Sequence, residues 1–408
     1  MTQGADVRLR SSWMLLGPAF VAAIAYVDPG NVAANVSAGA QFGFLLVWVI
    51  VVANAMACLV QYLSAKLGLV SGMSLPEAAG ARMRRPNRLT YWLQAELVAM
   101  ATDLAEVMGG AIALYLLFDL PLLTGGVITG IVSLLLLIVK DRRGQQMFER
   151  VITGLLLVIA IGFLTTLLVE PAPVDEVAAG LVPMFEGPES VLLAAAMLGA
   201  TVMPHAVYLH SGLARDRHGH PDPGPMRRML LRVTRWDVGI AMIIAGAVNL
   251  SMLLAAATNL QGRDNTDSIE GAHSAVQDTL GPTVALLFAI GLLASGLASS
   301  SVGAYAGAMI MQGLLHVSIP LVARRLITLT PALVILAIGV DPSRALVLSQ
   351  VVLSFGIPFA LIPLIRLTSD RALMGDDTNH RVTTALGWLV AALISVLNVV
   401  LIYLTIEG

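Results

Sequence analysis

The first long apolar stretch of the chain, residues 21–40, is interrupted by a short polar segment that could bind a cation. The interrupting residues are Asp28, Pro29, Gly30 and Asn31. Pro29 lacks a backbone N–H and its ring clashes with the carbonyl of Ala25, so that carbonyl is released, and Gly30 lets the chain leave helical geometry. A carboxylate, an amide and a free carbonyl at membrane depth predict a cation site. The alternative role for Asp28 is to cap the helix that Pro29 begins.

A second apolar stretch, residues 191–213, is interrupted in the same way at Met203, Pro204 and His205. Pro204 releases the carbonyl of Ala200. Methionine in an apolar helix is usually a packing residue, but Met203 occupies the break itself. Its thioether is a soft ligand that suits Mn²⁺, Fe²⁺, Co²⁺ or Cd²⁺ and adds little for Mg²⁺ or Ca²⁺, which prefer oxygen. The combined donor set therefore predicts selectivity for transition metals.

Three acidic residues lie in another apolar stretch, at Glu96, Asp103 and Glu106. Their spacing places them on one face of a helix over about 15 Å. Because acids facing lipid are costly, Asp103 and Glu106 predict a polar pathway, whereas Glu96 is equally consistent with an interfacial charge. Arg324 and Arg325 are either ordinary cytoplasmic charges or the counter-ions of this stripe.

Two histidines follow the second break. His205 and His210 are either satisfied core residues or, for His205, a ligand or a proton carrier near neutral pH. His218 and His220 lie in a turn and are expected to be ordinary loop residues.

The composition indicates a membrane protein. Of 408 residues, 57% are hydrophobic and only 12% are charged, whereas a soluble domain has about 25% charged residues. The mean hydropathy is +0.83. A single cysteine, Cys58, excludes an intrachain disulfide and a cysteine-based metal cluster. We see no basic patch of the kind that binds nucleic acid.

Eleven segments are apolar and long enough to cross a bilayer, which requires about 20 residues. The expected spans are 13–37, 43–66, 92–116, 121–139, 151–169, 189–214, 236–258, 281–313, 319–340, 345–366 and 384–405. If the N-terminus is cytoplasmic, every basic residue except Arg263 and Arg344 falls on the inner side, including Arg8 and Arg10. Acidic residues such as Asp264 and Asp267 fall outside. This alternation follows the positive-inside rule and predicts an extracytoplasmic C-terminus. The alternative interpretation of the N-terminus is a signal peptide.

Residues 1–408 are thus expected to form one all-α transmembrane domain with internal symmetry. Residues 13–169 and 189–366 each contain five spans and each begin with a broken helix, and 384–405 adds an eleventh. Because five is odd, the second group is inverted relative to the first. This layout is that of LeuT-type 5+5 inverted-repeat transporters.

The two broken segments resemble the signature motifs of the Nramp family of proton-coupled transporters of divalent transition metals. The resemblance extends to the acidic third span, the paired arginines and Gln350, and it covers essentially the whole chain. It implies these metal ligands: Asp28, Asn31, Met203, the backbone carbonyls of Ala200 and Ala25, and, in some states, Gln350. It also implies a proton route that starts at Asp28 and includes His205, Glu106, Asp103, Arg324, Glu96 and Arg325. His210 corresponds to a histidine of the inner vestibule.

We therefore expect a secondary active importer of Mn²⁺ or Fe²⁺, also accepting Cd²⁺ and Co²⁺, driven by proton symport. A bacterial cytoplasmic membrane is the expected location. No resident cofactor, enzymatic activity or obligate protein partner is expected; the metal, the proton and the lipid bilayer are the partners. The alternatives are a 5+5 symporter of an amino acid or similar solute, a channel, and a metal-sensing receptor.

Overall fold

The computed structural model describes residues 17–262, 268–317 and 319–407, and all regular structure in these ranges is helical. The predictions made for Arg8, Arg10, Arg263, Asp264 and Asp267, and for a signal peptide, lie outside the described residues.

Both predicted helix breaks are confirmed. The first span consists of α1 (Pro18–Ile24), the 3-10 turn η2 (Ala25–Val27) and α2 (Pro29–Phe42), with Asp28 extended between them at φ −72° and ψ 169°. The sixth consists of α9 (Gly187–Thr201) and α10 (Pro204–His218), separated by Val202 and Met203. Each second half begins with proline at its first position, where the missing N–H costs nothing.

The other predicted spans are continuous helices. Their bounds are α3 Val47–Ser71, α5 Arg85–Phe118, α6 Leu122–Arg143, α7 Gln145–Val169, α11 Pro225–Asn259, α13 Pro282–Leu315, α14 Leu321–Ala337, α15 Pro342–Thr368 and α17 Arg381–Glu407. The expected start of the second span at residue 43 is wrong. Gly43 has φ +56° and ends α2, so α3 begins only after a turn, at Val47.

By length and hydropathy, eight helical segments of the described chain could cross a membrane. Two further apolar helices, Pro18–Val27 and Leu122–Ile138, are shorter. The broken segment Gly187–His218 is central, because 94% of its apolar window is buried, whereas α17 is peripheral with 33% buried.

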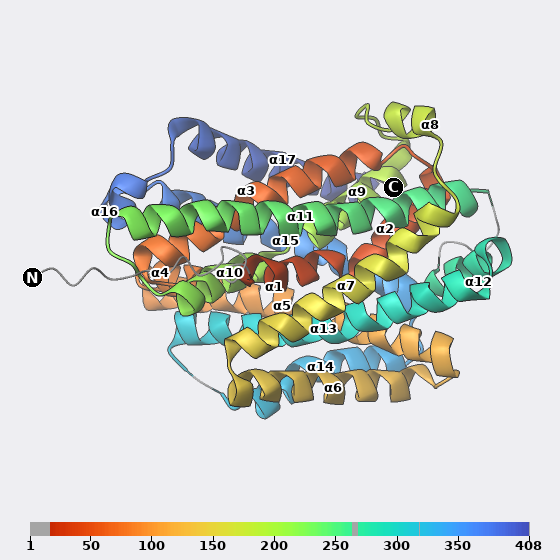
Figure 1. The fold of residues 1–408 in the computed structure, drawn as a ribbon, viewed down its shortest axis with the longest axis horizontal. Coiled ribbons are helices and arrows are strands. Elements are labelled where there is room, and N and C mark those ends of the chain that lie inside the picture. The colour runs from red at the N-terminus through yellow and green to blue at the C-terminus, as the bar shows by residue number, and fades with distance from the viewer. Residues whose placement is uncertain (1–16, 263–267, 318, 408) are drawn as a thin grey trace, which may run out of the picture.

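Short helices gather at the two ends of this bundle (Figure 1). One end carries α4 (Leu75–Gly80) and α16 (Arg371–Met374), which is followed by the 3-10 turn η3 (Gly375–Asp377). The other end carries α8 (Val174–Ala179) and α12 (Ile269–Leu280). The long helices therefore run between two capped ends, as expected for a protein whose spans cross a bilayer.

Close helix approaches depend on glycine. A β-carbon on Gly68 of α3 would lie 1.9 Å from the carbonyl oxygen of Ser211 on α10, and one on Gly39 of α2 would lie 2.4 Å from that of Leu253 on α11. Both contacts are with backbone, which cannot move aside without shifting a helix. These glycines fix the distance between the broken helices and their neighbours.

We predict that Gly68→Ala lowers stability by about 1–3 kcal/mol, the typical cost of overpacking. Gly239→Ala on α11 is the control, because its β-carbon would meet nothing within 4 Å, and alanine there gains up to about 1 kcal/mol of helix propensity. Thermal unfolding of the detergent-solubilised variants measures both effects. Equal midpoints for the two variants would contradict the assignment of a packing role to Gly68.

Candidate functional site

Asp28 uses its two carboxylate oxygens differently. Oδ1 accepts hydrogen bonds from the backbone N–H of Asn31 at 2.7 Å and from Asn31 Nδ2 at 2.9 Å. Asp28 is therefore the N-cap of α2, as the alternative interpretation proposed. Oδ2, by contrast, is buried and has no hydrogen-bond partner among the described residues. Capping occupies one oxygen and leaves the other available to a ligand.

Asn31 joins the two helix breaks. Its Nδ2 also donates to the carbonyl oxygen of Ala200 at 2.9 Å, across 169 residues of sequence. That carbonyl accepts a bond from a neighbouring span, as expected for one that Pro204 releases from the helix. The Asn31 Oδ1 atom is buried without a partner. The amide thus fixes the position of both breaks while keeping one oxygen free.

Gln350 of α15 packs against the first break. A β-carbon on Gly30 would lie 1.8 Å from Gln350 Nε2, so Gly30 makes room for this amide. Gly30 itself lies within α2, and the residue that leaves helical geometry is Asp28 rather than Gly30 as predicted. The Nε2 atom donates to Ser349 Oγ at 3.2 Å, and Oε1 is buried and unpartnered. Met203, the N-cap residue of α10, is fully buried at the second break.

Two carbonyls of the first break accept hydrogen bonds from side chains that were not predicted from the sequence. Asn249 Nδ2 of α11 donates to the carbonyl of Tyr26 at 2.7 Å, and Ser295 Oγ of α13 donates to that of Val27 at 2.6 Å. Ala25, the other predicted carbonyl ligand, begins the turn η2 and is 1% exposed. A buried asparagine inside an apolar span was the signal that could have identified Asn249.

The arginines of α14 are counter-ions of the acidic stripe on α5. Arg325 Nη1 lies 2.5 Å from Asp103 Oδ1, and Arg324 Nη2 lies 3.0 Å from Glu96. Both arginines are buried, so their charges are compensated by these acids rather than by water. Glu96 is paired and its side chain is only 12% exposed, which is compatible with either interpretation of this residue.

Glu106 is different, because it is fully buried and neither carboxylate oxygen has a hydrogen-bond partner among the described residues. It lies one helical turn beyond Asp103 on α5. Buried polar atoms are almost always paired, so an unpaired carboxylate at this position makes Glu106 a candidate functional residue.

The two histidines of α10 both keep one nitrogen unpaired. His205 Nδ1 lies 3.2 Å from Thr102 Oγ1 on α5, the residue before Asp103, and His210 Nδ1 lies 2.6 Å from Gln61 Oε1 on α3. Their Nε2 atoms are buried without partners among the described residues. His205 therefore links the second break to the acidic helix. Within the described chain, no group of three or more His, Cys, Asp or Glu side chains is arranged to hold a metal ion.

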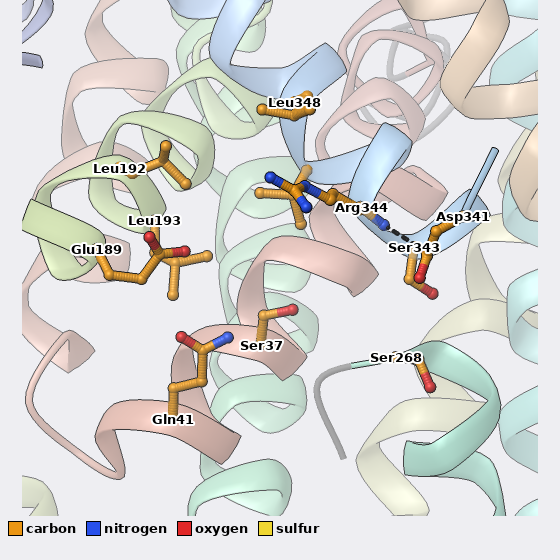
Figure 2. Close-up of a pocket in the computed structure, with 11 residues that line it drawn as sticks. Ser37, Gln41, Glu189, Leu192, Leu193, Ser268, Asp341, Ser343, Arg344 and Leu348 are labelled. Carbon is orange, nitrogen blue, oxygen red and sulfur yellow. Dashed lines mark hydrogen bonds between the residues drawn. The ribbon is translucent and has the colours of Figure 1, made fainter. Parts of the chain in front are cut away.

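A cavity of about 370 Å³ lies toward the α8 and α12 end of the bundle. It is lined by residues of α2, α9 and α15, the same helices that carry Asn31, Ala200 and Gln350. Figure 2 shows Glu189 of α9 and Arg344 of α15 on different walls of this cavity. The buried ligand candidates do not line it, so the cavity ends before the helix breaks.

Comparison with known proteins identifies the family of this chain. The sequence profile described as natural resistance-associated macrophage protein-like (Nramp) matches residues 19–404. The divalent metal cation transporter MntH of Mycobacterium tuberculosis is 72% identical over 408 residues, which is all of this chain and 95% of the relative.

Solved structures of two transporters are similar to this chain. A variant of the Eremococcus coleocola manganese transporter has a TM-score of 0.85 and 32% identity, and the alignment covers 98% of this chain and 88% of that one. Mhp1, a nucleobase-cation-symport-1 family transporter, has a TM-score of 0.59 at 17% identity over 95% of this chain and 90% of its own. That second likeness shows only the LeuT-type fold. The profile match over nearly the whole chain, together with a full-length relative at 72% identity, shows that this chain belongs to the Nramp family of transporters.

Proposed function

We propose that this chain imports divalent transition-metal ions, Mn²⁺ or Fe²⁺ and also Cd²⁺ and Co²⁺, together with protons. The observation that carries the proposal is a set of three buried oxygens without hydrogen-bond partners among the described residues. They are Asp28 Oδ2, Asn31 Oδ1 and Gln350 Oε1. Since native structures rarely leave such atoms unpaired, they are the expected first ligands of a cation. The names of the relatives, a divalent metal cation transporter and a manganese transporter, support this cargo.

In this proposal the metal binds between the two helix breaks. Asp28 supplies charge, Asn31 supplies a neutral oxygen and Met203 supplies the soft ligand that separates transition metals from Ca²⁺ and Mg²⁺. The carbonyls of Ala200 and Ala25 and the amide of Gln350 contribute as the conformation changes. One carboxylate among these donors suits a cargo that must also be released, because few charges hold the ion.

Protons take a separate route along α5. Asp28 is the first acceptor, and His205 passes the proton toward Glu106 and then to the pairs Asp103–Arg325 and Glu96–Arg324. Support comes from the unpaired Nε2 of His205 and the unpaired carboxylate of Glu106. His210 belongs to the inner vestibule, where its Nδ1 contacts Gln61.

For the topology we propose eleven spans in a bacterial cytoplasmic membrane, with two inverted repeats at 13–169 and 189–366 and an additional span at 384–405. The N-terminus is cytoplasmic and the C-terminus extracytoplasmic. The α4 and α16 end is then the inner side, in agreement with the basic residues near it. The 370 Å³ cavity, whose lining includes Ser268 beside α12, then lies on the outer side.

Alternating access explains why the inner end is tightly closed. Ser64 Oγ donates to the carbonyl of Val207 at 2.6 Å, and the N–H of Leu75 donates to Ser211 Oγ at 2.7 Å. Arg215 of α10 also pairs with Glu77 of α4. These contacts hold α10 against α3 and α4 and must break before a metal leaves to the cytoplasm.

A solute symporter of the same fold is the second candidate, but it would gain nothing from a sulfur at the break.

The proposed topology predicts which positions react with a membrane-impermeant maleimide. In a Cys58→Ser background, Ala178→Cys on α8 should label in intact cells, and Arg84→Cys, just before α5, should label only after permeabilisation. Both native positions are exposed in this structure. Labelling of Arg84→Cys in intact cells would overturn the proposed orientation.

If the Met203 sulfur selects transition metals over Ca²⁺, replacing it should weaken that selectivity. In proteoliposomes with an imposed pH gradient, Met203→Ala should lose about tenfold or more in affinity for Mn²⁺ and Cd²⁺, since losing even an outer-shell partner costs about 10- to 100-fold. Ca²⁺ should then compete with Mn²⁺. Met197→Ala is the matched control, because Met197 is equally buried on α9 but lies away from the break. If Met203→Ala still excludes Ca²⁺, the proposed role of the Met203 sulfur in metal selectivity is wrong.

The proton route predicts the behaviour of Glu106→Gln. The substitution is isosteric and removes no hydrogen bond, so the protein should fold and bind Mn²⁺. Proton influx accompanying Mn²⁺ should fall by about tenfold or more, because a positioned acid–base group accelerates proton transfer by at least about a hundredfold. Glu189→Gln in the outer cavity is the control. Equal proton-to-metal ratios in wild type and Glu106→Gln would remove Glu106 from the route.

A further inference from the structure

The helix opposite the acidic stripe, α13, presents small residues toward it. Ser300, Gly303 and Gly307 are spaced by three and four residues and therefore share one face of the helix. Small residues in membrane helices usually allow two backbones to approach. Gly296 of the same helix does this, because a β-carbon there would lie 2.8 Å from the backbone nitrogen of Gly110 on α5.

Gly307 makes room for a charged side chain instead. A β-carbon on Gly307 would lie 2.0 Å from Nη2 of Arg324 and 2.8 Å from its Cζ atom. The same Nη2 atom lies 3.0 Å from Glu96. Any side chain at position 307 would therefore displace the guanidinium from the place where it meets Glu96. Arg324 is only 4% exposed, so it has little free space into which to move.

Gly303 faces the carboxylate of Glu106. A β-carbon on Gly303 would lie 2.9 Å from both carboxylate oxygens of Glu106 and 3.3 Å from Cδ. Those oxygens have no hydrogen-bond partner among the described residues. The absent side chain at Gly303 therefore leaves the carboxyl free to change its orientation, which a proton carrier needs in order to accept and release on different sides.

Ser300 completes the set through a direct bond. Its hydroxyl accepts a hydrogen bond from Nη2 of Arg325, whose Nη1 pairs with Asp103 at 2.5 Å. Ser133 of α6 accepts from Nε of the same guanidinium at 3.1 Å. The neighbouring Ser299 differs, because its hydroxyl donates to the carbonyl of Ser295 in its own helix at 2.7 Å.

We propose that Ser300, Gly303 and Gly307 are positioning residues for proton transfer, which set the geometry of Arg325, Glu106 and Arg324 from the opposite helix. The proposal rests on the proton symport proposed above. It assigns to α13 a role in coupling, in addition to its packing against α5. Substitutions on α13 should therefore change the number of protons moved per metal ion, although α13 contributes none of the proposed metal ligands or proton carriers.

The test is parallel measurement of ⁵⁴Mn²⁺ uptake and of proton influx in proteoliposomes, across a series of external pH values. Gly307→Ala and Ser300→Ala should lower the proton-to-metal ratio by about twofold or more and shift the pH profile, because each changes a contact of an arginine that pairs with an acid of the route. Their matched controls, Gly239→Ala and Ser299→Ala, should keep the wild-type ratio. Ser300→Ala adds no volume, so it remains informative if Gly307→Ala does not fold.

A double-mutant cycle separates positioning from packing. In an Arg324→Ala background, Gly307→Ala should have no further effect on the ratio, because the side chain it displaces is gone. If the variants lose metal and proton uptake in equal proportion, or if the two changes are additive, the residues are only structural. If the wild-type protein moves Mn²⁺ without protons, the proposed symport itself is wrong. If the wild type moves protons and the variants keep its proton-to-metal ratio, only the role proposed for Ser300, Gly303 and Gly307 is wrong.

Discussion

The structure depends on the cost of leaving a polar atom unpaired in an environment without water. In hydrocarbon every backbone carbonyl needs a donor, so a helix can break only where side chains or ligands replace the lost bonds. Asn31, Asn249 and Ser295 supply those donors at the two breaks. Among the buried oxygens without partners in the described residues, those on Asp28, Asn31 and Gln350 are informative because they lie on or against the first break.

The same cost explains what the sequence could predict. Pro29 and Pro204 lie in apolar segments beside Asp28, Asn31 and His205, and Asp103 or Glu106 cannot face lipid cheaply, so the breaks and the acidic stripe could be predicted from the sequence. Proline alone is not sufficient for a break, because Pro331, Pro358 and Pro363 lie inside continuous helices. The partners of these groups were not visible. Single polar residues such as Asn249 or Thr102 are common in membrane helices, and only the packing of distant spans shows which carbonyl or histidine each one contacts.

Buried ion pairs contribute little net stability, because desolvation of both charges offsets most of their attraction. Apolar residues of similar volume in place of Arg325 and Asp103 would pack as well, without the hydroxyls of Ser133 and Ser300 that satisfy the guanidinium. The presence of two such pairs beside an unpaired Glu106 is therefore better explained by function than by folding.

The second break connects the two halves of this mechanism. Met203 is the N-cap residue of α10, and His205, two residues later, contacts Thr102 beside Asp103 on α5. A movement of α10 that changes the position of the Met203 sulfur must also change the distance between His205 and the acidic helix. Because the same helix carries Arg215 and Ser211, which contact α4, this movement would also break the contacts at that end, which is the cytoplasmic side in the proposed topology. In the proposed mechanism, metal release, proton transfer and opening are thus joined through one helix, and no long chain of intermediate residues is needed to couple them.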